Sequence, residues 1–314
     1  MNRPMRDQAV EEGAFPEDAT LLYVIGAQKA GTTWLNHYLQ SHPDCHIRRG
    51  EVHYFEITHG PEGRGWLNSR LQQIADLAQE LKHRRGEKFA RTRATLSQFV
   101  EHAEIFEGRP GDHSRYLSYL SRGWQGERVI ADVSPSYIIL DRTAFGAMAG
   151  LAPKTSFVLI LRDPIDRFWS SIRMIERRRG VAKDFAERCA DRAWSALDRR
   201  VQEHMLRSDY GRVIGELEAV GLGPRAHYFF YEDLFQAATI KRLCGALDIP
   251  YVEASFTVEK NAGVPASLDE QLARRMYAKF APIYEAMADR FGNALPARWR
   301  EHMAAYGAPS PAVG

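Results

Sequence analysis

The sequence has few cysteines and no long apolar run, and each absence excludes a class of protein. Its three cysteines, Cys45, Cys189 and Cys244, are widely spaced and include no C-x-x-C pair, so they predict neither a disulfide framework nor a zinc site. No apolar run is long enough to span a bilayer, and the first twenty residues hold charges and prolines rather than an apolar segment. We therefore expect a soluble, cytoplasmic protein with a flexible N-terminus over residues 1–19.

The chain also lacks an excess of charge of either sign. Its 42 lysine and arginine residues nearly balance 40 aspartate and glutamate residues, which gives a formal net charge of +2. No global field therefore favours nucleic acid or an anionic membrane, and an anion must be bound by a local site. Composition leaves the oligomeric state open.

Apolar segments typical of buried strands alternate with amphipathic segments typical of helices along the 314 residues. The runs LLYVI, RVIADV and SFVLIL are short, rich in strand-forming residues and separated by helical patterns. Strands that alternate with helices favour a parallel sheet with helices on both faces. We predict an α/β fold with a P-loop-like central parallel sheet flanked by helices.

Residues 62–125 interrupt this alternation. The segment WLNSRLQQIADLAQEL places apolar residues on one helical face, and glycine-punctuated basic stretches follow it. We predict that residues 62–125 are a helical insertion within a single domain over residues 20–295. A C-terminal tail over 296–314 is expected to follow the domain.

The segment GAQKAGTTW connects the first predicted strand to a helix through a loop bounded by Gly26 and Gly31. Backbone N–H groups of such a loop converge on one point and the helix dipole adds positive potential, so the loop suits a tetrahedral oxyanion. The glycine spacing matches the nucleotide-binding P-loop, G-x-x-x-x-G-K-[ST], but Thr32 replaces its lysine and Lys29 lies inside the loop. Thr32 and Thr33 add hydroxyl donors.

A second anion site is predicted where LRDPIDRFWSS ends one strand and begins a helix. Arg162 stands at the strand end, and Ser170 follows about two turns into the helix. A guanidinium is a planar fork suited to phosphate, and a serine hydroxyl adds a donor. A nucleotide with two separate phosphates would explain both sites. A surface ion pair of Arg162 with Asp163 or Asp166 is the alternative.

Five motifs occur along the chain in one order: GAQKAGTTWLNHYLQSHPD, GEVHYF, SPSY, LRDPIDRFWSS and YEDL. In this order they resemble the sulfotransferases that use 3′-phosphoadenosine 5′-phosphosulfate (PAPS). The resemblance spans most of residues 21–235 and is strongest to the branch that includes heparan sulfate 3-O- and N-sulfotransferases and many bacterial sulfotransferases. It implies in-line transfer of the PAPS sulfuryl group to a hydroxyl or amine, with adenosine 3′,5′-bisphosphate as the product.

The resemblance also implies roles for individual residues. Arg162 and Ser170 would bind the 3′-phosphate, and no metal is needed because Lys29 and backbone donors supply positive charge at the leaving oxygen. In the late segment EKNAGVPAS, Lys260 and Asn261 are further candidates for the donor, with an ordinary polar turn as the alternative. The 5′-phosphosulfate would be cradled by Lys29, Ala30, Gly31, Thr32, Thr33 and Trp34.

The acceptor must lose a proton, and GEVHYFE offers Glu51 and His53 as bases. The resemblance to a K-E-V-x-F-F-like motif of related glycan sulfotransferases implies that Glu51 is the base. His53 is the second choice, and we favour a packing or supporting role for it. Gly50 and Val133 stand where the heparan enzymes tend to have lysine, which weakens the case for a heparan acceptor. We expect a small-molecule, lipid or glycan acceptor.

Two other functions stay open at this point. A P-loop kinase or NTPase would use ATP and magnesium, with Asp132 as its Walker B carboxylate, although Thr32 stands where that chemistry needs lysine. A non-catalytic nucleotide-binding protein could have kept the loop alone.

The insertion over 62–125 is expected to help form the acceptor wall, with core packing as the alternative for its aromatic residues. These are Trp66, Phe89, Phe106, Tyr116, Tyr119 and Trp124.

Overall fold

A parallel β-sheet forms the centre of the protein. The computed structural model describes residues 14–60, 63–198, 205–256 and 264–307, and within them five strands have the order β2-β3-β1-β4-β5. The central strand pairs in parallel with β3 and β4 and is almost wholly buried, which confirms the predicted P-loop-like sheet. The strands are β1 (Thr20–Gly26), β2 (Cys45–Ile47), β3 (Val129–Val133), β4 (Thr155–Leu161) and β5 (Ala226–Phe230).

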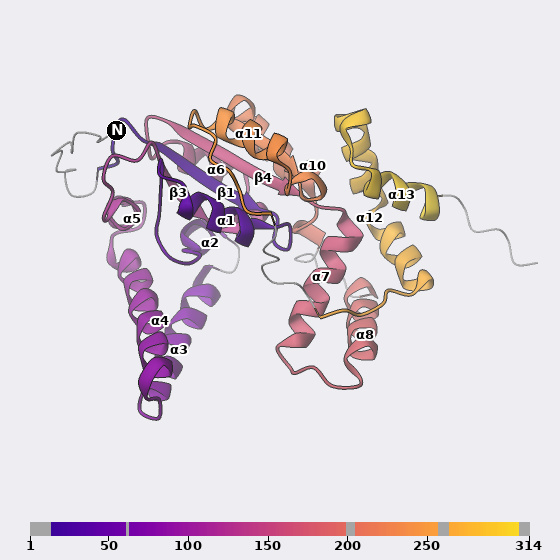
Figure 1. The fold of residues 1–314 in the computed structure, drawn as a ribbon, viewed down its shortest axis with the longest axis horizontal. Coiled ribbons are helices and arrows are strands. Elements are labelled where there is room, and N and C mark those ends of the chain that lie inside the picture. The colour runs from indigo at the N-terminus through magenta and orange to yellow at the C-terminus, as the bar shows by residue number, and fades with distance from the viewer. Residues whose placement is uncertain (1–13, 61–62, 199–204, 257–263, 308–314) are drawn as a thin grey trace, which may run out of the picture.

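Helices flank this sheet, as predicted (Figure 1). Within the described ranges, none of them is long and apolar enough to cross a membrane. The helices outside the 62–125 segment are α1 (Thr32–Ser41), α2 (Tyr54–His59), α6 (Arg142–Ala149), α7 (Pro164–Arg177), α8 (Phe185–Asp198), α10 (Tyr210–Ala219), α11 (Ala237–Ala246), α12 (Glu270–Phe291) and α13 (Ala297–Tyr306).

A helical hairpin projects from the sheet between β2 and β3 in the sequence (Figure 1). It consists of α3 (Gly63–Leu81) and α4 (Gly86–Glu104), and α5 (Ser114–Ser121) returns the chain to β3. At its base, the ring of Trp66 stacks on His53 with centroids 4.8 Å apart. The hairpin therefore borders the loop that follows β2 and carries Glu51.

The C-terminal segment differs from the expected tail, because residues 297–306 form α13. Trp299 is fully buried against the rings of Tyr210, Phe230 and Tyr284. The helix forms because Trp299 and His302 lie three positions apart, so both are buried on the same side of α13. So short an apolar pattern is only a weak signal of a helix in the sequence. At the other end, Phe15 and Ala19 of the expected flexible N-terminus are buried.

Gly31 cannot be replaced without strain, because it has a φ of 84° at the start of α1. A Cβ there would lie 2.7 Å from Leu234 Cδ2. We expect Gly31→Ala to lower the free energy of unfolding by about 2–4 kcal/mol through the left-handed backbone and overpacking.

Chemical denaturation measures this loss, with Gly245→Ala as the matched control. Gly245 is exposed within α11 and has open space at its Cβ position, so alanine there should stabilise by about 0.5–1 kcal/mol. Equal stability of the two variants would contradict the role of Gly31.

Candidate active site

The predicted site residues gather at the edge of the sheet where the parallel strands end. The carboxyl ends of parallel strands share one edge, and ligands bind in the loops beyond it. Because β1 lies between β3 and β4, the glycine loop is flanked by the residues that follow those two strands. In the order of the strands across this edge, His53 follows β2, Ser134 follows β3 and Lys29 follows β1. Arg162 then follows β4, and Tyr231 follows β5.

The N-terminus of α1 has no capping side chain. Gly31 occupies the N-cap position, Thr32 is buried and Thr33 is exposed. The first N–H groups of a helix lack intrahelical acceptors, so an uncapped start can donate to an anion. Aspartate side chains accept these N–H bonds at the starts of other helices, namely Asp141 for α6, Asp163 for α7, Asp209 for α10 and Asp269 for α12.

Arg162 is tied to the glycine loop rather than to a surface carboxylate. Its Nη1 donates a hydrogen bond to the backbone oxygen of Lys29 at 2.6 Å, and its guanidinium lies over the ring of Tyr231 at 4.2 Å. Its Nε is buried and has no hydrogen-bond partner in the described part of the chain. No ion pair joins Arg162 to Asp163 or Asp166 there, so the surface-pair alternative is wrong.

Three further arginines lie near Lys29, and sequence reasoning missed them. They are Arg173 and Arg177 of α7 and Arg178 at its C-cap. Ser170, Arg173 and Arg177 lie at i, i+3 and i+7, which places them on one face of α7. Arg173 Nη1 donates to the oxygen of Val264 at 3.3 Å, while its buried Nε has no partner among the described residues. The available signal was the arginine-rich run RMIERRR at this spacing.

The cations near Lys29 are not neutralised by carboxylates. Burial lowers the pKa of Lys29, and the positive charges of Arg162, Arg177, Arg173 and Arg178 lower it further. Across the described ranges, none of these five side chains forms an ion pair. An anion bound between them would relieve this repulsion and raise the pKa of Lys29.

Glu51 and His53 contact each other in the segment between β2 and α2. Glu51 is half exposed, and its Oε2 lies 3.3 Å from His53 Nε2. On its other nitrogen, His53 Nδ1 lies 2.8 Å from Glu56 Oε2 and 2.9 Å from Ser136 Oγ. Burial lowers the pKa of His53, but hydrogen bonds with Glu51 and Glu56 outweigh it and raise the value to about 9. At neutral pH this imidazole is protonated, which fits a supporting role.

Ser134 of the SPSY motif connects His53 to Asp132, because its Oγ accepts the backbone N–H of His53 at 3.4 Å and donates to the carboxylate of Asp132. That carboxylate is fully buried and accepts hydrogen bonds from Ser134 Oγ at 2.6 Å, Tyr116 OH at 2.7 Å and Tyr137 OH at 2.8 Å. A Walker B aspartate must instead reach a magnesium ion at the phosphates. The carboxylate that kept the kinase alternative open is therefore an internal acceptor.

The YEDL motif supports the glycine loop and Arg162. Tyr231 lies under the Arg162 guanidinium, and Leu234 occupies the space beside Gly31. Glu232 Oε1 accepts the backbone N–H of Asp163 at 2.9 Å. The motif thus positions the loop and the strand end together.

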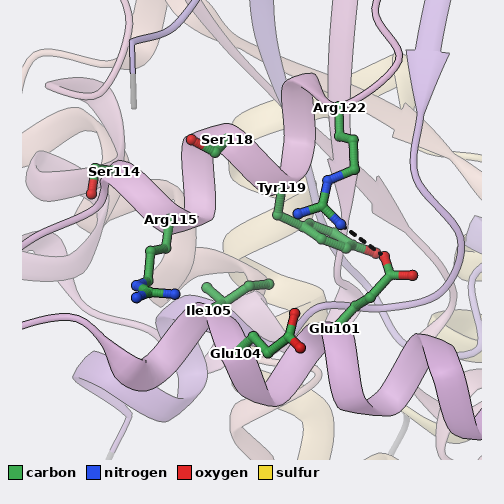
Figure 2. A pocket seen from close by; sticks show the side chains of 8 residues that line it. All are labelled: Glu101, Glu104, Ile105, Ser114, Arg115, Ser118, Tyr119 and Arg122. Carbon is green, nitrogen blue, oxygen red and sulfur yellow. Dashed lines mark ion pairs between the residues drawn. The ribbon is translucent and has the colours of Figure 1, made fainter. Parts of the chain in front are cut away.

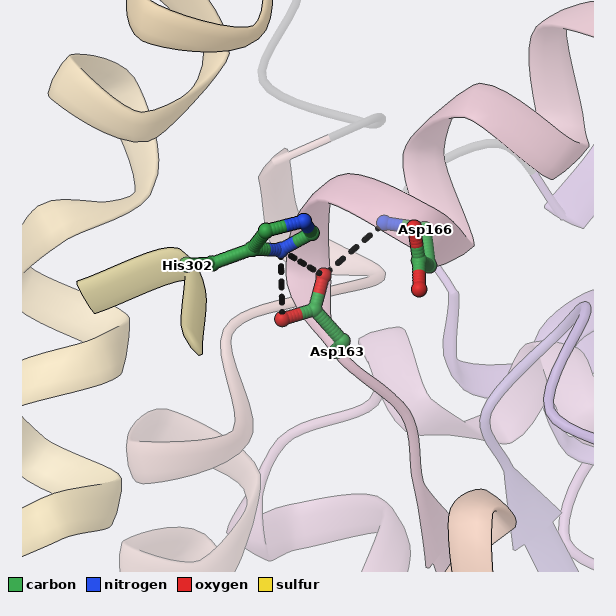
Figure 3. A group of neighbouring side chains, drawn as sticks. All are labelled: Asp163, Asp166 and His302. Atoms are coloured by element: carbon green, nitrogen blue, oxygen red, sulfur yellow. Dashed lines mark hydrogen bonds and ion pairs between the residues drawn. The ribbon is translucent and has the colours of Figure 1, made fainter. Parts of the chain in front are cut away.

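Two carboxylates that follow Arg162 in the sequence lie beside a histidine of α13 at the start of α7 (Figure 3). Ligand-type atoms of Asp163, Asp166 and His302 lie within 4.8 Å of one another. His302 Nδ1 lies 3.0 Å from both Asp163 oxygens, Tyr284 OH donates to Asp163 at 2.7 Å, and Arg298 donates to Asp166 at 2.9 and 3.0 Å. These atoms already bond one another, so the group fastens α13 to the start of α7.

The indole N–H of Trp34 is used within the protein rather than left available for a phosphate. Its indole Nε1 donates to the oxygen of Ser255 at 3.2 Å, and its ring stacks with Tyr38 and Phe256 at 5.9 and 5.8 Å. It borders a cavity of about 430 Å³ formed between α1 and residues 253–255. Lys260 and Asn261 lie outside the described residues.

A second cavity, of about 390 Å³, lies between α4 and α5 (Figure 2). Arg122 Nη1 and Glu101 Oε2 lie 3.6 Å apart on its wall. It contains none of the predicted site residues, but the hydroxyl of its wall residue Tyr119 donates to the oxygen of Arg49 at 3.2 Å.

The aromatic residues of the insertion have different surroundings. Trp66 stacks on His53, whereas Phe89 is exposed. The other four follow the core-packing alternative: Phe106, Tyr116, Tyr119 and Trp124.

Comparison with known proteins decides the family. A model of the sulfotransferase family matches residues 22–253. The chain belongs to the sulfotransferase family. This sulfotransferase is similar in fold to a sulfotransferase from Alicyclobacillus acidocaldarius, with 17% identity over 89% of this chain and 98% of that one and a TM-score of 0.58. No curated protein sequence matches it.

Two further solved structures resemble the enzyme more weakly. The sulfotransferase domain of the Synechococcus PCC 7002 olefin synthase is 17% identical over 99% of this chain and 100% of that one, with a TM-score of 0.44. A sulfotransferase domain of the curacin biosynthetic pathway is 14% identical over 93% and 99%, also with a TM-score of 0.44. The family match favours sulfuryl transfer over the kinase and non-catalytic alternatives, and it does not extend to the heparan sulfate branch.

The charge state of His53 can be measured by NMR titration of its imidazole. We expect its proton to leave near pH 9 rather than near the ordinary value of 6.5, because Glu51 and Glu56 both stabilise the cation. In Glu51→Gln the pKa should fall, since one carboxylate is lost.

The raised pKa also links His53 to stability, with a definite sign. The folded value exceeds the unfolded one, so the contribution is complete below about pH 6.5 and is lost as pH rises through 9. We expect the stability difference between the native enzyme and His53→Asn to shrink by about 3 kcal/mol over that window. Titration near pH 6.5 in the native enzyme would contradict the paired arrangement.

Proposed function

We propose that this sulfotransferase uses PAPS as its donor and a hydroxyl or amine as its acceptor. The observation that carries the proposal is the cluster of unneutralised cations beside the uncapped start of α1. Two guanidinium nitrogens, Nε of Arg162 and Nε of Arg173, are buried without partners in the described residues. Buried donors without acceptors are costly, so a bound oxyanion is the physical reason for retaining them.

The two parts of the cluster fit a donor with two anionic groups. The 5′-phosphosulfate would lie at Lys29 and the N–H groups that begin α1, and the 3′-phosphate would lie at Arg162, Ser170 and Arg173. PAPS supplies an activated sulfuryl group that departs from its 5′-phosphate. Lys29 would stabilise the negative charge that develops on that phosphate, so we expect no metal requirement.

Glu51 is the proposed general base on the acceptor side. Half of its side chain is exposed, and protonated His53 holds one of its oxygens. This arrangement orients the carboxylate while leaving its other oxygen free to take the acceptor proton. Because Trp66 of α3 stacks on His53, we also propose that the base of the α3–α4 hairpin lies on the acceptor side.

Isothermal titration calorimetry tests the donor assignment. We expect adenosine 3′,5′-bisphosphate to bind much more tightly than AMP, because the second phosphate pairs with buried guanidinium groups. Arg173→Gln should weaken the bisphosphate by about 10- to 100-fold and change AMP far less. Arg162→Gln should weaken both ligands, because it also removes the hydrogen bond to the oxygen of Lys29 in the glycine loop.

The matched control is Arg91→Gln, since Arg91 is exposed on α4 and pairs with Glu87. It should leave both affinities unchanged. An affinity for the bisphosphate no better than for AMP would remove the proposed donor.

Replacing the proposed base separates binding from turnover. We expect Glu51→Gln to keep the affinity for adenosine 3′,5′-bisphosphate and to lower kcat by about 10²- to 10⁴-fold, as is typical for loss of a general base. Sulfated product is measured by mass spectrometry after screening glycans, lipids, phenols and amines. A near-normal rate in Glu51→Gln would refute the assignment of Glu51.

A further inference from the structure

Arg70 on α3 is a half-buried cation without a bonded partner. The carbon of its guanidinium lies over the ring of Phe99, 4.1 Å from the ring centroid. Within the described ranges it has no hydrogen bond and no ion pair. Two other arginines of the hairpin do have carboxylate partners, since Arg84 pairs with Glu80 at 3.0 Å and Arg91 pairs with Glu87 at 3.1 Å. Arg70 is therefore held in place by stacking while its donors remain unused.

The position of Arg70 connects it to the proposed base. It lies one helical turn after Trp66, on the same face of α3, and Trp66 stacks on His53. His53 in turn contacts Glu51. Burial lowers the pKa of Arg70, while the negative charge of Glu51 raises it, so the two groups lie within electrostatic range.

The other groups around Arg70 do not neutralise it. Burial, together with the charge of Arg70, lowers the pKa of His102 to about 4, so that side chain is neutral. Arg48 is itself a cation and bonds Glu101 at 2.5 Å. Glu51 is the carboxylate whose charge acts on Arg70, and it must stay open to the acceptor to act as a base. A fixed guanidinium fork beside it suits a planar carboxylate.

We propose that Arg70 binds a carboxylate of the acceptor, which makes the acceptor a hydroxy acid or an amino acid derivative. This inference rests on the proposed function of the site. The carboxylate pairs with the fork of Arg70, and the hydroxyl or amine of the same molecule meets Glu51. The positive charge of Arg70 also offsets the repulsion between Glu51 and an anionic acceptor.

Binding of matched acids and esters tests the proposal directly. The full chain, saturated with adenosine 3′,5′-bisphosphate, is titrated with three acids and their methyl esters: 4-hydroxybenzoate, glucuronate and 3-hydroxyoctanoate. We expect at least one acid to bind about 10- to 100-fold more tightly than its ester, as one charge-assisted pair allows. If no acid is preferred over its ester, the proposal is wrong.

Variants assign the preference to Arg70. Arg70→Gln should abolish the preference for the acid, Arg70→Lys should keep part of it, and Arg91→Gln should leave it intact. Thermal unfolding of each variant shows that it remains folded. A preference that survives Arg70→Gln would overturn the proposal.

Kinetics distinguish acceptor binding from a role in orienting Glu51. With PAPS and the preferred acid, Arg70→Gln should raise KM by the same 10- to 100-fold and leave kcat nearly unchanged. An equal fall in kcat for acid and ester would show that Arg70 acts on Glu51 instead. The donor assignment can be wrong without affecting this test. If the bisphosphate binds no better than AMP, the preference for the acid over its ester is measured on the chain without nucleotide.

Discussion

The hydrogen bond from Arg162 to the backbone oxygen of Lys29 is the contact on which the rest of the site depends. It joins the end of β4 to the loop after β1, and these two strands are neighbours in the sheet. Tyr231 stacks on the guanidinium, and Tyr210 OH donates to the backbone oxygen of Arg162 at 2.7 Å. A charged donor fixed in this way orders the loop and brings α7 with its cations beside the start of α1.

Collecting these cations costs stability in the free enzyme. Like charges close together, and guanidinium nitrogens buried without acceptors, are unfavourable until an anion binds. The surrounding structure holds them in place through neutral and paired contacts, including the group of Asp163, His302 and Tyr284 behind the strand end. Groups whose pKa is shifted by such crowding are concentrated at functional sites, because binding or catalysis uses the stored repulsion.

The proposed acceptor side is held together by ion pairs rather than by unneutralised cations. There His53 carries its charge between two carboxylates, and Ser136 of SPSY completes its surroundings. Glu51 is the exposed member of this group, and α3 approaches it with Trp66 and Arg70. One side of the sheet edge therefore offers positive charge for the proposed donor, while the other offers the proposed base Glu51 and the guanidinium of Arg70 for the proposed acceptor.

The sequence by itself determined the strands, the glycine loop and its family, because these depend on local patterns. Buried runs such as LLYVI, the positive backbone angle that Gly31 permits, and the spacing of Arg162 from Ser170 are all readable within a few residues. The same motifs identified Glu51 and Lys29 as candidates. The same local patterns predict a tail over 296–314, whereas residues 297–306 form α13.

Only the tertiary structure decided which distant residues meet. Strand order places Arg162 against Lys29, 133 positions apart, and buries Asp132 under three hydroxyl groups, which ends its use as a magnesium ligand. Packing of the α3–α4 hairpin brings Arg70 near Glu51, and hydrogen bonds with Glu51 and Glu56 give His53 its charge. These outcomes depend on burial and on charges contributed from elsewhere in the chain, which no local sequence pattern encodes.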